Sequence, residues 1–129
     1  MSTTEERLPE YILPNLADIV TQVEGDVLFQ ISLDARGEVI DIECLASATQ
    51  PKNTIPLDLL LDGPRGVGAS SVMYVSNASR SLESPEDCDT EFTARLIEAG
   101  AMAGIPVADH YLVRDHRVVS LKATTALWS

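Results

Sequence analysis

The chain has 129 residues, with 20 acidic and 9 basic side chains and a net charge of −11 at neutral pH. Its apolar share of 45% and charged share of 22% are typical of one globular domain and exclude wholesale disorder. The nine basic residues are scattered singly, so we expect no direct binding of nucleic acid, which needs a Lys/Arg surface against the phosphates.

The sequence also bears on location. No stretch approaches the roughly 18 apolar residues that a membrane-spanning helix needs. The start, Met1-Ser-Thr-Thr-Glu-Glu-Arg7, has neither a basic nor an apolar leader segment, so we expect no secretory signal and a cytoplasmic location. In that compartment Cys44 and Cys88 are expected to be free, reduced thiols, and Cys44, within a strand, a buried and inert one.

The first third of the chain predicts a short helix and a hairpin. Residues 1–23 are expected to form a polar N-terminal segment with a helix confined by Pro14 to Asn15–Val23, and residues 24–129 a single domain. The β-branched and aromatic residues of Asp26–Asp34 predict a strand. It turns at Gly37, which supplies a positive φ, into a second strand over Glu38–Ala46.

The middle of the chain predicts a helix and a buried strand. Ile55–Asp62 is leucine-rich and is expected to be a helix that ends at Gly63-Pro64. Ser70–Val75 is apolar and suited to a strand covered on both faces.

The clearest signals mark a long helix over Pro85–Ala103. Ser84 is a hydroxyl N-cap, Pro85 takes the first helical position, and Gly104 sits where a left-handed C-cap belongs. Two strands follow, Val107–Val113 and Val118–Leu121, on either side of a turn. Trp128 lies in a C-terminal tail that we expect to pack back on the sheet, with a homodimer contact as the alternative. This order of elements predicts an α/β domain with a mixed sheet.

Catalytic motifs are scarce. The chain has neither a Gly-rich phosphate loop nor a G-x-S-x-G elbow. Its histidines, His110 and His116, each follow an aspartate, and neighbouring residues on a strand point to opposite faces, so such a pair cannot hold one metal ion. We expect His110 to be a hydrogen-bonded strand residue and His116 a turn residue.

A family resemblance rests on one long segment. Phe92-Thr-Ala-Arg-Leu-Ile-Glu-Ala-Gly100-Ala-Met-Ala-Gly-Ile-Pro-Val-Ala-Asp-His110 resembles the C-terminal part of RadC-like proteins, which carry a JAB/MPN (JAMM) domain. The hairpin over residues 27–40 and the segment Gly68–Val75 look like the family's opening strands and the strand before its metal loop. Over about residues 24–123, the resemblance implies a cytidine-deaminase-like α/β/α sandwich.

The family's metal signature is His-x-His-x7-Ser-x-x-Asp with a glutamate from an earlier strand. Two imidazoles and a carboxylate hold zinc, and the glutamate takes a proton from the metal-bound water. Aligned without gaps, Asp89 matches the aspartate, Ser76 and Ala78 fall on the histidines, and Glu43 is the counterpart of the glutamate. Shifting the loop by two residues matches Ser84-x-x-Asp87 instead, but no histidine precedes residue 110.

The resemblance therefore implies a degenerate member. We expect no zinc, no other cofactor and no peptidase activity, and a RadC/JAB-like domain that acts through contacts with an unknown protein partner. One alternative is a hydrolase with a rebuilt site that binds Mg²⁺ or Ca²⁺ through oxygen ligands. Its candidate residues are Glu43, Ser76, Ser79, Asp87 and Asp89. A further alternative is the DNA-repair association that the family's name carries, which the charge of −11 disfavours as direct DNA contact.

Overall fold

The computed structural model describes residues 12–23, 27–46, 56, 59–77, 87–115 and 117–128, with the backbone alone at 46 and 87–89. The helices are α1 (Ile12–Gln22), α2 (Asp62–Gly66), α3 (Asp87–Ala103) and α4 (Leu121–Thr124). The strands are β1 (Leu28–Leu33), β2 (Val39–Ala46), β3 (Ser71–Asn77), β4 (Val107–Arg114) and β5 (Arg117–Ser120). None of the helices in this part of the chain is long and apolar enough to span a membrane.

The five strands form one mixed sheet in the order β2-β1-β3-β4-β5. Strand β1 is antiparallel to both β2 and β3, β3 and β4 are parallel, and β5 returns antiparallel to β4. Since parallel strands need a crossover connection, α3 lies between β3 and β4 in the sequence. The predicted α/β fold with a mixed sheet is confirmed.

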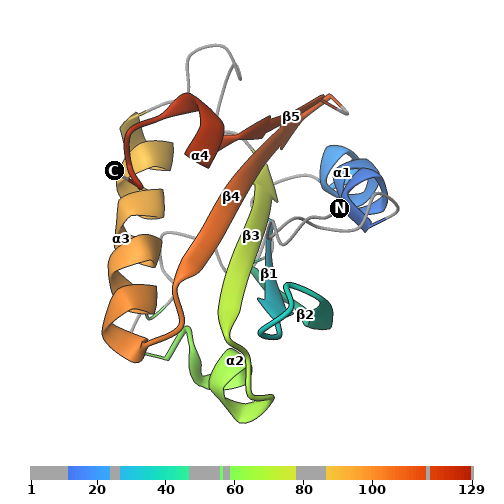
Figure 1. Cartoon of the computed structure of the whole chain (residues 1–129). Coiled ribbons are helices and arrows are strands. Elements are labelled where there is room, and N and C mark those ends of the chain that lie inside the picture. The colour runs from blue at the N-terminus through green and yellow to red at the C-terminus, as the bar shows by residue number, and fades with distance from the viewer. Residues whose placement is uncertain are drawn as a thin grey trace.

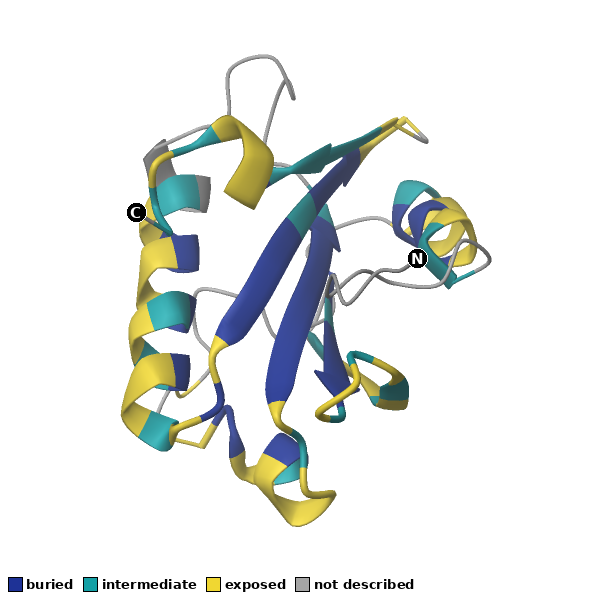
Figure 2. Cartoon of the chain, viewed as in Figure 1, coloured by how far each residue is buried: buried dark blue, intermediate teal, exposed yellow. Residues whose placement is uncertain are grey.

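Helices cover both faces of this sheet. Figure 1 shows α1 on one side and α3 on the other. On the α1 side, Leu16 and Val20 pack with Ile31 and Met73 from the strands. On the α3 side, a second cluster includes Leu28, Val72, Tyr74, Phe92 and Leu96. The central strands are therefore buried along most of their length, as Figure 2 shows, and the layers are helix, sheet and helix.

Two helices begin differently from the prediction, and prolines are the reason. Helix α1 begins at Ile12, before Pro14, and not at Asn15. The predicted helix over residues 55–62 is wrong, because α2 starts at Asp62 and runs through Gly63 and Pro64. In both helices the proline is the third residue, where the backbone N–H has no partner within the helix, so its absence costs nothing.

The glycine-marked turns are confirmed. Gly37 has φ of 79° in the β1–β2 turn, where the Asp34 carboxylate accepts from the backbone N–H groups of Arg36 and Glu38. Gly104 has φ of 76° directly after α3, and the Ile105 N–H donates to the carbonyl of Gly100. The bond from Ile105 satisfies a carbonyl group that the end of α3 leaves unpaired.

Candidate functional site

Ser76, the first of the two positions aligned with metal-binding histidines, lies near the end of β3. Its side chain is fully buried. The hydroxyl oxygen lies 2.7 Å from Nε2 of His110 on the neighbouring strand β4. The strand end that the resemblance singled out is therefore turned inward, onto an imidazole.

His110 joins three elements of the fold. Its second ring nitrogen, Nδ1, lies 2.7 Å from the hydroxyl oxygen of Thr93 in α3. Only 1% of His110 is exposed, and Thr93 is fully buried. Hydroxyls donate as well as accept, so either neutral tautomer of the ring is accommodated. We call Ser76, His110 and Thr93 the His110 bridge, and the prediction that His110 is a hydrogen-bonded strand residue is confirmed.

Asp109, the residue before His110, bonds to residues of β5 and α4. Its carboxylate accepts from the Ser120 hydroxyl at 2.6 Å, from the backbone N–H of His110 at 2.7 Å and from that of Lys122 at 3.2 Å. It therefore fixes the corner at which β5 passes into α4. The Asp-His pair thus points two ways, as the strand geometry predicts.

The His110 bridge continues into a polar row across the sheet. Paired positions on successive strands place Glu43 beside Gln30, Gln30 beside Tyr74, and Tyr74 beside His110. The Gln30 amide donates to the Tyr74 hydroxyl and to the carbonyl of Leu60, both at 2.9 Å. The rings of Tyr74 and His110 meet edge to face, with centroids 6.2 Å apart.

Burial controls the ionisation of Tyr74. Loss of hydration raises the pKa of its phenol far above the usual range, and the hydrogen bond from Gln30 lowers that pKa by less. The phenol therefore remains neutral wherever the protein is folded at ordinary pH. The neutral Tyr74 phenol and the Gln30 amide thus satisfy each other inside the core.

Glu43 stands apart from the His110 bridge. It is exposed on the edge strand β2, three strands from His110, which corresponds to about 14 Å at ordinary strand spacing. Its carboxylate lies against α2, where a Cβ on Gly63 would come 2.5 Å from Glu43 Oε1. It borders a small cavity of about 140 Å³ that Gln30 and Leu60 also line. The structure does not bring Glu43 and Ser76 together.

The other predicted site residues divide into two groups. Cys44 is exposed, so the prediction of a buried thiol is wrong. It lies on the edge strand β2, and α1 contacts β3 and β4 and so leaves that side of β2 open. The remaining candidates have side chains that lie outside the described residues: Ala78, Ser79, Asp87, Cys88, Asp89 and His116.

The arrangement suits a structural role better than a reactive one. A serine hydroxyl hydrogen-bonded to an imidazole that a third group orients is the geometry of an activated nucleophile. Here Ser76 has no exposed surface and His110 has 1%, so both groups are closed to solvent in this structure. Within the described ranges, no three His, Cys, Asp or Glu side chains lie close enough together to hold a metal ion.

Sequence reasoning missed Thr93, Gln30 and Tyr74. Thr93 carries a usable signal, because it shares a helix face with Leu96 and Gly100, at a spacing typical of core positions. A hydroxyl on such a face needs a buried partner. Gln30 lies between two apolar strand residues, so its amide likewise needs a buried partner.

Comparison with known proteins agrees with this architecture. The family model described as "RadC-like JAB domain" matches residues 2–126. Among similar proteins is UPF0758 protein TTE0897 of Caldanaerobacter subterraneus subsp. tengcongensis, 27% identical over 114 residues that cover 88% of this chain and 49% of the relative. A UPF0758 protein of Moorella thermoacetica is 25% identical over 127 residues, which cover 98% of this chain and 56% of the relative.

The chain spans about half the length of the curated relatives it matches. The family model matches nearly all residues of this chain, and this match identifies the chain's fold and ancestry. The chain belongs to the RadC-like JAB domain family.

Proposed function

We propose that this chain is a RadC/JAB-like domain that has lost its metal site and acts through protein–protein contacts in the cytoplasm. The observation that carries the proposal is the burial of Ser76. The gap-free alignment implied by the resemblance places Ser76 at the position of a metal-binding histidine. Its side chain is fully buried, and its hydroxyl oxygen lies 2.7 Å from His110 Nε2.

The donor set supports the same proposal. A serine hydroxyl is neutral at ordinary pH and a poor zinc ligand, and the alanine at position 78 offers no ligand atom. One carboxylate, from Asp89 or from Asp87 in the shifted alignment, does not hold zinc against water. These residues do not fit a zinc ion, so no hydrolytic step through a metal-bound water follows for this chain.

The alternatives receive less support. An oxygen-ligand site for Mg²⁺ or Ca²⁺ needs several carboxylates around one point, and Glu43 lies on the edge strand, apart from Ser76. Direct contact with DNA, the plainest form of a repair role, is opposed by the net charge of −11.

Metal content tests the proposal. The purified chain, dialysed without chelator, is expected to contain far less than one zinc ion per molecule by elemental analysis. Its melting temperature is expected to stay the same when EDTA is added, because no structural metal is withdrawn. About one zinc per chain, lost in Asp87→Asn or Asp89→Asn but kept in the exposed control Asp62→Asn, would overturn the proposal.

A further inference from the structure

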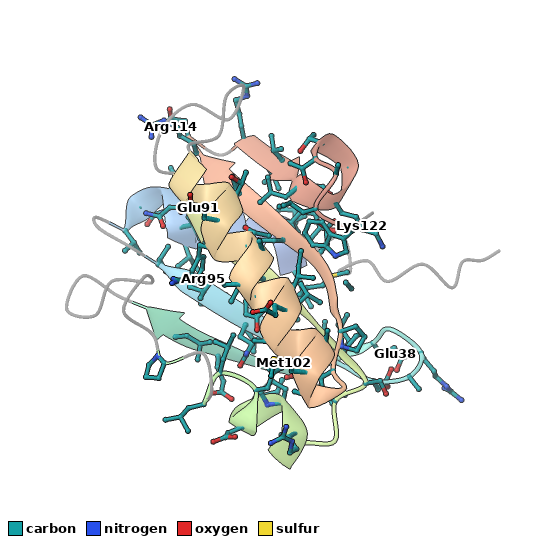
Figure 3. All side chains as sticks on the ribbon, turned by 90° about the vertical axis from the view of Figure 1, so that its left-hand side faces the viewer. Glu38, Glu91, Arg95, Met102, Arg114 and Lys122 are labelled. Carbon is teal, nitrogen blue, oxygen red and sulfur yellow. The ribbon has the colours of Figure 1, made fainter. Side chains whose placement is uncertain are left out.

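A groove of about 380 Å³ runs between α2 and the C-terminal half of α3. Leu61, the residue before α2, is only 4% exposed and lines the groove. From α3 come Ala99 and Ala103, whose methyl groups leave the space unfilled, and Met102, which is 84% exposed. Figure 3 looks onto this outward side of α3.

The groove differs in composition from the chain as a whole. The chain has more than twice as many acidic as basic residues, yet two arginines, Arg65 from α2 and Arg95 from α3, line this one groove. Arg65 also pairs with Asp62 at 3.8 Å, but both side chains are more than 60% exposed and such a pair is weak. Arginine and methionine, which are enriched at protein interfaces, stand here beside apolar side chains, together with one acidic residue, Glu98.

We propose that this groove binds an acidic segment of a partner protein that inserts one large apolar side chain over Ala99 and Ala103. This inference rests on the proposed function, since it names the kind of partner that a contact domain takes. The apolar side chain is covered by Leu61 and Met102, and the segment's carboxylates meet the guanidinium groups of Arg65 and Arg95. Guanidinium suits this task because its fork of N–H donors matches a carboxylate.

Charge complementarity selects an acidic segment over a basic one. Arg65 and Arg95 attract carboxylates at contact distance. Glu98, which also lines the groove, and Asp62, which pairs with Arg65, oppose this attraction in part. The net charge of −11 repels an acidic partner at long range, but at about 0.15 M ionic strength this repulsion is screened beyond about 8 Å. Binding is therefore expected at physiological salt and is governed by the groove itself.

A pair of synthetic peptides tests the inference with the full chain. The probe is a short fluorescein-labelled peptide with a central Phe flanked by Glu residues, and its counterpart has Lys in place of each Glu. Titration followed by fluorescence anisotropy is expected to show saturable binding of the acidic probe alone. Arg95→Glu is expected to weaken that binding about tenfold or more and Met102→Ala severalfold, while Glu98→Gln strengthens it.

The matched control is Arg114→Glu. It makes the same change in charge at an exposed arginine, and Figure 3 shows Arg114 at the opposite end of the molecule from Met102. Binding by this variant is expected to stay within about twofold of the unaltered chain. Absence of saturable binding, equal weakening by Arg114→Glu and Arg95→Glu, or preference for the Lys peptide would each overturn the inference.

The two proposals fail in different ways. If the chain contains no zinc and does not bind the acidic probe, the inference about the groove is wrong and the proposed function is unaffected. A chain that carries stoichiometric zinc overturns the proposed function, whatever the probe does.

Discussion

The Ser76 hydroxyl oxygen lies 2.7 Å from Nε2 of His110, within the buried layer between the sheet and α3. The two residues come from strands that are adjacent in the sheet but separated by 34 positions in the sequence. Thr93 extends the contact to the helix that connects those strands. The crossover unit of β3, α3 and β4 is thus tied together inside by two hydrogen bonds to one ring.

Removal of this ring is expected to be costly. His110→Ala should lower the free energy of unfolding by about 3 kcal/mol, because it leaves a cavity and two buried hydroxyls without their imidazole partner. Ser76→Ala should lower it by about 1 kcal/mol. Urea unfolding of both variants and of the double variant completes a cycle, with an expected coupling of about 1 kcal/mol. Ser70→Ala, at an exposed serine, is the control with an expected effect near zero; additive effects of the two core substitutions would contradict the bridge.

Two histidines at the positions where the family carries them should restore metal binding. In the variant Ser76→His with Ala78→His, we expect zinc to bind and to raise the melting temperature, since an aspartate remains available. His110 Nε2 lies 2.7 Å from the Ser76 hydroxyl oxygen, so the His110 ring must shift to make room for the new imidazole at position 76. Elemental analysis and zinc-dependent melting measure the gain, and Ser76→His alone is the control. A folded double variant that takes up no zinc would show that the loop has been reshaped, and Glu43 and Asp89 would lose their standing as candidates.

Gly100 and Gly66 should respond to alanine in opposite directions. A Cβ at Gly100 would lie 2.6 Å from the carbonyl oxygen of Ile105, a backbone atom that cannot turn aside. Gly100→Ala is therefore expected to lower the free energy of unfolding by about 2 kcal/mol. Gly66 has nothing within 4 Å, so Gly66→Ala should raise it by about 0.5 kcal/mol. Thermal and urea unfolding check both values, and a neutral Gly100→Ala would mean that α3 stands off from β4.

The buried phenol of Tyr74 should make the folded protein less stable at alkaline pH. Burial raises the pKa of its phenol in the folded state, so the unfolded chain loses this proton first, near the ordinary tyrosine pKa of about 10. The contribution of the neutral Tyr74 phenol to the free energy of unfolding is therefore fully present below pH 10 and declines as the pH rises above 10. Urea unfolding between neutral and alkaline pH should show this decline, and Tyr74→Phe should reduce it. An equal decline in Tyr74→Phe and in the unaltered chain would refute the assignment to Tyr74.

Local signals predicted elements better than they predicted the site. Helix α3 from Asp87 to Ala103 and the β1–β2 turn were foreseen, because turn and cap glycines such as Gly37 and Gly104 act within a few residues of their position. The predicted N-cap Ser84 and Pro85 lie outside the described residues. The same logic failed at Pro14 and Pro64, where a proline in a first turn resembles a helix breaker. The polar row depends on strand register between Gln30 and Tyr74, which are 44 positions apart. No local pattern reports that pairing. The contact of His110 with Ser76 likewise joins residues 34 positions apart, so it was not foreseen.

The position of Trp128 makes the chain's single tryptophan a spectroscopic reporter. Its indole N–H donates to the carbonyl of Val107 at 2.8 Å, and its ring packs against the cluster on the α3 side and the pair Leu112 and Leu121. Its fluorescence therefore responds when the C-terminal segment leaves the start of β4, a local event that backbone circular dichroism barely detects. Comparison of the two signals during unfolding separates release of this segment from collapse of the sheet. If the two transitions coincide, the C-terminal segment and the sheet unfold as one cooperative unit.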